Sequence, residues 1–142
     1  MKKKSQPKEA CYWSANIYLA EEIVKSTDYL IKHLKGYPGV FDKERCRRSR
    51  AKIILYSKAN EKKWRNILTE IHDGFKLYRD CDGDFHEWKD GKAPPASETI
   101  EKMMERINSG NDTYKLVINK AKLQKFRNAM KLFAKYYEHL WD

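Results

Sequence analysis

The sequence predicts an all-α fold, a single bundle of four to five helices within residues 10–142. Long segments place apolar residues three and four positions apart, which is the period of one helix face. Glycines fall mainly between those segments, where they end helices. A chain of 142 residues with 41% hydrophobic and 13% aromatic content can also bury one core without disulfide or metal staples. One helical domain is therefore expected.

The first predicted helix covers residues 10–35 and follows a lysine-rich tail, residues 1–9, that we expect to be disordered. The Gly-Tyr-Pro-Gly turn at 36–39 ends this helix, because glycine supplies left-handed backbone and proline cannot continue the hydrogen-bond ladder. Asp42 is a candidate cap for a second helix. Its periodicity allows either a break near Asn60 or continuation to Tyr78.

Residues 80–96 are rich in Asp, Gly and Pro and are predicted to form an acidic loop. Ser97 is a candidate cap for a short helix. The apolar residues of that helix, Ile100, Met103, Met104 and Ile107, are expected to face the core. The last helix has the clearest pattern, with Leu123, Phe126, Met130, Phe133, Tyr137 and Leu140 on one face.

Two segments are also typical of β-strands, because they are short and rich in β-branched residues. They cover residues 53–56 and 114–118. A minor two-stranded ribbon beside the bundle is therefore an open alternative for these segments.

Positive charge dominates the chain, with 30 Lys and Arg residues against 20 Asp and Glu residues and a formal net charge of +10. The densest stretch runs from residue 43 to residue 65, where Glu44 and Glu61 are the only carboxylates. Ten basic residues lie there: Lys43, Arg45, Arg47, Arg48, Arg50, Lys52, Lys58, Lys62, Lys63 and Arg65. Holding like charges on one element costs self-repulsion, which a polyanion relieves by releasing its counterions.

These ten residues are the predicted phosphate contacts of a nucleic-acid-binding surface. Aromatic residues alternate with the cations, and Tyr56 and Trp64 are the candidates for stacking on unpaired bases. Because proteins stack aromatic side chains mainly on single-stranded RNA, RNA is favoured over DNA as the partner. An acidic protein surface is an alternative partner for the same basic face, and a second copy of the chain is a further alternative partner.

Arg65 and His72 are the candidates for catalysis. Seven residues advance a helix by about 700°, which returns the two side chains to nearly the same side. The pair resembles the Arg-x(4 to 6)-His motif of the HEPN family of helical ribonucleases. The resemblance implies metal-independent RNA cleavage at a dimer interface, with His72 in acid/base work and Arg65 on the scissile phosphate.

Further short strings are similar to two families of RNA-associated helical bundles. Residues 56–60 and Trp141 resemble the accessory protein of diversity-generating retroelements and its ribosomal intervening-sequence relatives. Residues 65–68 and 123–126, with Met130, are similar to the helical small subunit of type III CRISPR effectors. Both resemblances imply a basic helical bundle that works within a larger assembly.

Other chemistry has little support in the sequence. Residues 80–84 resemble the start of an EF-hand calcium loop, but Phe85 and Gly91 stand where that loop needs glycine and a bidentate glutamate. Because of these mismatches, no metal is expected. Motifs for a serine nucleophile and for nucleotide binding are also absent, so no cofactor is expected. The three cysteines are odd in number and widely spaced, which is typical of reduced thiols and not of a disulfide framework. No apolar run is long enough to span a membrane. A cytoplasmic location is therefore expected.

The sequence thus predicts a non-catalytic nucleic-acid-binding protein, an accessory subunit of a larger assembly that binds RNA ahead of DNA. Two alternatives are kept. One is an inhibitor or adaptor that docks its basic face on an acidic protein, and the other is the HEPN-type ribonuclease.

Overall fold

The computed structural model describes residues 14–42, 50–110 and 113–140, with the side chains of residues 40, 42 and 50–56 outside that description. Within these residues the chain is mainly helical with a small two-stranded antiparallel sheet, which confirms the predicted fold class. The helices are α1 (Ala15–Lys32), α2 (Arg50–Asp80), α3 (Ile100–Asn108) and α4 (Lys120–Tyr136). The strands are β1 (His86–Trp88) and β2 (Leu116–Ile118). Short 3-10 turns are η2 (Gly39–Asp42), η4 (Lys89–Gly91) and η5 (Tyr137–His139).

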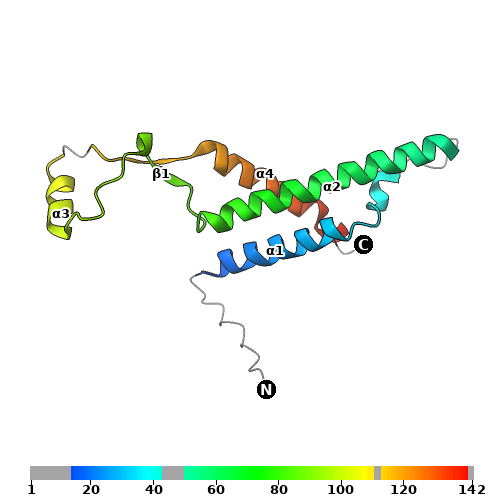
Figure 1. Ribbon diagram of the computed structural model, residues 1–142, viewed down its shortest axis with the longest axis horizontal. Helices are drawn as coiled ribbons and strands as arrows, with labels where there is room; N and C mark the ends of the chain where they lie inside the picture. The colour runs from blue at the N-terminus through cyan, green and yellow to red at the C-terminus, as the bar shows by residue number, and fades with distance from the viewer. Residues whose placement is uncertain (1–13, 43–49, 111–112, 141–142) are drawn as a thin grey trace, which may run out of the picture.

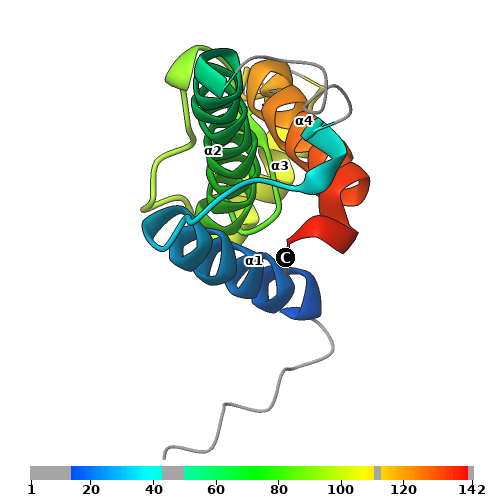
Figure 2. The ribbon, with the colours of Figure 1, turned by 90° about the vertical axis from the view of Figure 1, so that its right-hand side faces the viewer.

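Helices α1, α2 and α4 form the bundle. Figure 2 shows α2 and α4 side by side, with α1 across one side of the pair. Helix α2 runs antiparallel to α1, because Tyr78 Oη accepts a hydrogen bond from Asn16 Nδ2 (2.6 Å) while Arg65 reaches Ile31 at the other end. It also runs antiparallel to α4, since Tyr78 stacks on Phe126 while Trp64, nearer the start of α2, contacts Tyr136 at the end of α4. The bundle therefore has one long central helix with a partner on each of two sides.

The core lies along the buried side of α2. Leu68, Ile71 and Thr27 are fully buried where α1 meets α2, and the Thr27 hydroxyl donates to the Ile23 carbonyl of its own helix at 2.7 Å. On the α4 side, Phe75 packs edge-on against Phe126 and Phe133. Close packing of aliphatic and aromatic side chains on both sides thus fixes the two interhelical contacts.

Asn60 does not break α2, which is continuous from Arg50 to Asp80. Of the two alternatives from the sequence, continuation is therefore the correct one. The Asn60 side chain is buried and its Nδ2 donates to the Phe41 carbonyl at 3.2 Å. Because this long-range bond occupies the amide, the side chain does not compete for hydrogen bonds with its own backbone.

The ribbon forms, but with a partner that the sequence did not indicate. Strand β2 pairs antiparallel with β1, and Val117 faces Glu87 in the register. Of the two segments for which a strand was an open alternative, residues 114–118 contain β2, whereas residues 53–56 lie within α2. Position inside a 31-residue helix outweighs the β-branched character of that short string.

The expectation that α3 faces the core is wrong. Its apolar residues are exposed, and Ile100 reaches 76%. The helix instead turns its basic side to its own chain, where Arg106 binds both carboxylate oxygens of Glu98 (2.9 and 3.2 Å) and lies over the Tyr114 ring. Its N-cap is Thr99, which accepts from the Lys102 amide, rather than Ser97. Figure 1 shows α3 at one end of the long axis, beyond the ribbon.

Candidate nucleic-acid interface

Four of the predicted phosphate contacts fall where the structure describes side chains. Lys58, Lys62, Lys63 and Arg65 are all exposed on α2. Lys43, Arg45, Arg47 and Arg48 lie outside the described residues, and for Arg50, Lys52 and Tyr56 the backbone is helical but the side chain lies outside that description.

Three of these cations share one solvent-facing side of α2, whereas Lys63 lies on another side, over the Phe41 ring. Lys58, Lys62 and Arg65 follow one another at spacings of four and three residues, which places them on one helix face. The buried residues Trp64, Leu68 and Ile71 occupy the opposite side. The first part of the described α2 face is therefore a solvated basic stripe.

Carboxylates of the acidic loop do not neutralise this stripe. Asp80 pairs with Arg79 (3.1 Å), and Glu87 pairs with Lys122 (2.6 Å). Among the described residues, none of the four α2 cations forms an ion pair with a carboxylate. Arg65 Nη1 instead donates to the Ile31 carbonyl at 3.1 Å. Three of the four ammonium or guanidinium groups are thus left without a hydrogen-bonding partner in the described part of the chain.

Trp64 belongs to the core and not to an exposed stacking surface. Its side chain is 5% exposed and meets Phe41 and Tyr136 edge-on, with ring centroids 6.2 and 5.6 Å apart. Phe41 and Tyr136 also contact one another. A base cannot stack on Trp64 without unpacking these rings, so Trp64 is left out of the candidate interface.

The same three rings bring cations from two helices together. Lys63 of α2 lies over the Phe41 ring, with Nζ 4.8 Å from the centroid. Lys135 of α4 lies over the Tyr136 ring at 5.3 Å. Because Phe41 and Tyr136 are in contact, both ammonium groups stand on one aromatic cluster.

Helix α4 carries a second basic face that the sequence reasoning missed. Residues 120–136 contain six basic residues and no acidic ones. Exposed members that share one side of the helix are Lys120, Arg127, Lys131 and Lys135, with Gln124 and Asn128 between them. A charge count restricted to this periodic segment would have found the face, whereas a count from residue 99 onward mixes it with the carboxylates of α3.

Antiparallel packing places the end of α4 beside the basic part of α2. The Trp64–Tyr136 contact fixes this pairing at one end and the Tyr78–Phe126 stack fixes it at the other. We call the resulting surface the basic end. It comprises Lys58, Lys62, Lys63, Arg65, Lys131 and Lys135.

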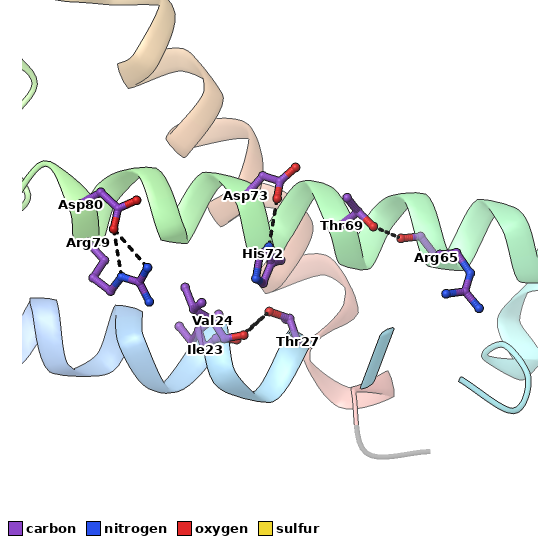
Figure 3. A network of polar contacts seen from close by, with 9 residues as sticks. All are labelled: Ile23, Val24, Thr27, Arg65, Thr69, His72, Asp73, Arg79 and Asp80. Atoms are coloured by element: carbon purple, nitrogen blue, oxygen red, sulfur yellow. Dashed lines mark hydrogen bonds and ion pairs between the residues drawn. The ribbon is translucent and has the colours of Figure 1, made fainter. Parts of the chain in front are cut away.

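The two candidate catalytic residues have separate partners. His72 is half-buried between α2 and α1, and its Nδ1 lies 2.9 Å from the Asp73 carboxylate (Figure 3). Arg65 lies two turns away and binds the Ile31 carbonyl. Each side chain is thus tied to its own neighbour rather than to the other.

Residues 81–83 form a turn directly after α2. Asp82 and Gly83 adopt positive φ angles of 51° and 74°. The Asp84 carboxylate accepts from the His86 amide and side chain, and these hydrogen bonds hold the pKa of Asp84 below its ordinary value. Within the part of the chain that the structure describes, no three His, Cys, Asp or Glu residues gather as metal ligands.

Comparison with protein-family models, with curated proteins and with solved structures finds no match to this chain. The resemblances to helical RNA-associated families therefore rest on the short strings that suggested them. None of the described helices is long and apolar enough to cross a membrane.

Proposed function

We propose that this protein binds nucleic acid without catalysing a reaction on it, and that it does so through the basic end. The observation that carries the proposal is the meeting of Lys63 and Lys135 on one aromatic cluster, flanked by exposed cations of both helices. A surface with several cations and no carboxylate partner attracts phosphates and gains free energy from counterion release.

Contact with the aromatic rings also lowers the entropic cost of binding for these two lysines. A lysine over a ring samples fewer positions than one that is free in solvent, so it loses less conformational entropy when it contacts a phosphate. Lys63 and Lys135 are in this state before any partner arrives.

RNA is favoured over DNA as the partner. Unpaired bases stack on exposed aromatic rings, and single-stranded RNA presents such bases more often than duplex DNA does. Tyr18, Tyr29 and Tyr137 are large exposed aromatics on α1 and at the end of α4. We propose that the protein acts in this way as an accessory subunit of a larger assembly.

Charge reversal tests the basic end. In Lys58→Glu/Lys62→Glu/Lys131→Glu, affinity for a short unstructured RNA should fall at least about tenfold, because three phosphate contacts become repulsive. Fluorescence anisotropy with labelled RNA, and with DNA of the same sequence, measures the loss. Since all three lysines are exposed, the helical circular dichroism should be unchanged.

The matched control reverses three exposed lysines outside the basic end, in Lys89→Glu/Lys92→Glu/Lys102→Glu. Both variants change the net charge by the same amount. A loss of RNA affinity in the basic-end variant alone would therefore locate the interface at the basic end. Equal losses would contradict an interface at the basic end. If the protein binds neither RNA nor DNA at low salt, an acidic protein partner is favoured instead. If it cleaves RNA without metal and His72→Ala abolishes the cleavage, the ribonuclease is favoured.

A further inference from the structure

The solvent side of α4 carries a continuous polar stripe. The buried residues of this helix are Ala129 and Tyr136, and both lie against α2, which runs beside α4 in Figure 2. Exposed polar residues on the other side fall within an arc of about 100° around the helix axis. We call this set the α4 stripe, and its members are Lys120, Gln124, Arg127, Asn128, Lys131 and Lys135.

The α4 stripe contains cations and amides but no carboxylate. Lys120, Arg127 and Lys131 have no ion-pair or hydrogen-bond partner in the described part of the chain. The first acidic residue that follows is Glu138, beyond the end of α4. Unpaired cations along about 22 Å of one helix face repel one another, and a polyanion that lies along the face removes this cost.

Two side-chain amides lie among these cations. Gln124 Nε2 donates to Asn128 Oδ1 at 2.8 Å, across one turn of the helix. This bond leaves Gln124 Oε1 as an acceptor and Asn128 Nδ2 as a donor, and both side chains are exposed. The Watson–Crick edge of an unpaired base offers the complementary combination, a donor beside an acceptor. In a duplex the opposite base occupies that edge, so the amide pair suits a single strand.

The α4 stripe is continuous with the basic end. Lys131 and Lys135 belong to both, and Lys135 lies on the same aromatic cluster as Lys63 of α2. Arg127 precedes Lys131 by one turn, and Lys120 lies about 16 Å before Lys131 along the helix axis. A strand bound at the basic end therefore meets further unpaired cations if it continues along α4.

We propose that a single strand of nucleic acid lies along the α4 stripe, with phosphates on the cations and an unpaired base on the Gln124–Asn128 pair. This inference rests on the proposed function and extends the basic end into a path along one helix. Duplex nucleic acid is the poorer partner, because its phosphates can contact the cations but its paired bases do not present the edge that the amides bind.

Charge reversal at Arg127, outside the basic end, tests the path. In Arg127→Glu, affinity for an unstructured, fluorescein-labelled RNA of about 12 nucleotides should fall at least about fivefold, because a phosphate contact becomes repulsive. The matched control is Lys125→Glu, an exposed position on the same helix but outside the arc of the stripe. It makes the same change in net charge, and affinity should fall less than about twofold. Fluorescence anisotropy measures both, and helical circular dichroism should be unchanged.

Removal of the amide pair separates base contact from charge. The wild type should bind the single strand at least about fivefold more tightly than a duplex RNA of the same length, since each hydrogen bond to the base adds affinity. Gln124→Ala/Asn128→Ala should lose this preference and keep its affinity for the duplex. The slope of log K against log salt should stay the same, because the variant keeps every cation.

Three results would overturn the path along α4: equal losses in Arg127→Glu and Lys125→Glu, a wild type that binds duplex RNA as tightly as the single strand, or an amide variant that keeps the preference for single strands. In each of these cases the protein still binds RNA, so the proposed function at the basic end would stand. A wild type that binds neither form of RNA at low salt would instead remove the proposed function, and the path with it.

Discussion

At the scale of single residues, Gly74 sets how closely α2 and α4 approach. A Cβ at this position would overlap the Ala129 methyl and would lie 3.1 Å from the Lys125 carbonyl oxygen. Ala129 is itself fully buried. The two small residues therefore allow the backbones of α2 and α4 to approach closely at this point.

Gly74→Ala should destabilise the protein by about 1–3 kcal/mol through overpacking, although alanine favours a helix over glycine by about 1 kcal/mol. Urea unfolding followed by circular dichroism measures the change. Gly36→Ala is the control, because a Cβ there meets nothing within 4 Å, and it should stay within about 0.5 kcal/mol of the wild type. A Gly74→Ala variant as stable as Gly36→Ala would show that the helices separate without cost.

At the scale of elements, the ribbon depends on its attachment to α4. Two strands of three residues are too short to be stable alone. The Asn119 amide donates to the Phe85 carbonyl at 2.8 Å, and Glu87 accepts from both Asn119 Nδ2 and Lys122 Nζ. Asn119 also caps α4 by accepting from the Lys122 amide. One cluster of polar groups thus joins β1 to the start of α4.

This attachment should depend on pH. Hydrogen bonds from Lys122 and Asn119 hold the pKa of Glu87 below its ordinary value, and Glu87 raises the pKa of Lys122. The stabilisation is therefore complete between the two ordinary values, and it is lost as the pH falls through the lowered pKa of Glu87 or rises through the raised pKa of Lys122.

NMR titration of the Glu87 carboxyl carbon checks this prediction. In Lys122→Met the pKa of Glu87 should move up towards the ordinary value, because the hydrogen bond from Lys122, which lowers this pKa most, is gone. Hydrogen exchange at the Asn119 amide should quicken in the same variant. Identical titration curves for wild type and variant would contradict the role of Lys122.

At the scale of the whole molecule, charge is divided between two regions. Residues 80–110, which contain β1 and α3, hold eight carboxylates and four basic residues, although the whole chain has a net charge of +10. The bundle therefore carries the excess of positive charge, and the protruding segment is acidic. This division directs a polyanion to the bundle and away from α3.

Salt dependence should report the division. For single strands, log K falls against log salt with a slope of about −0.7 for each phosphate that the protein neutralises. Lys58→Ala/Lys62→Ala/Lys131→Ala should therefore flatten the slope by about 0.7 for each of these lysines that binds a phosphate. The control Lys89→Ala/Lys92→Ala/Lys102→Ala should give a line parallel to the wild type. Parallel lines for all three proteins would place the phosphate-binding residues elsewhere.

Much of the candidate site could be predicted and some could not. The cations Lys58, Lys62 and Lys63 are exposed on one helix, as expected from their spacing. Trp64 is a different case, because an aromatic residue among lysines has the same sequence context whether it packs inward or faces solvent. The contribution of Lys131 and Lys135 depends on how α4 packs against α2, which no local pattern specifies.

Helical class, the approximate extent of α1, α2 and α4, and the excess of positive charge all follow from the sequence alone, because helical period and charge are local properties. Three other features required the packed chain: residues 116–118 pair with residues 86–88, Trp64 is buried, and the apolar side of α3 faces solvent. These three have a common cause. A pattern shows that a segment has an apolar side, but the position of the other segments decides whether anything covers it.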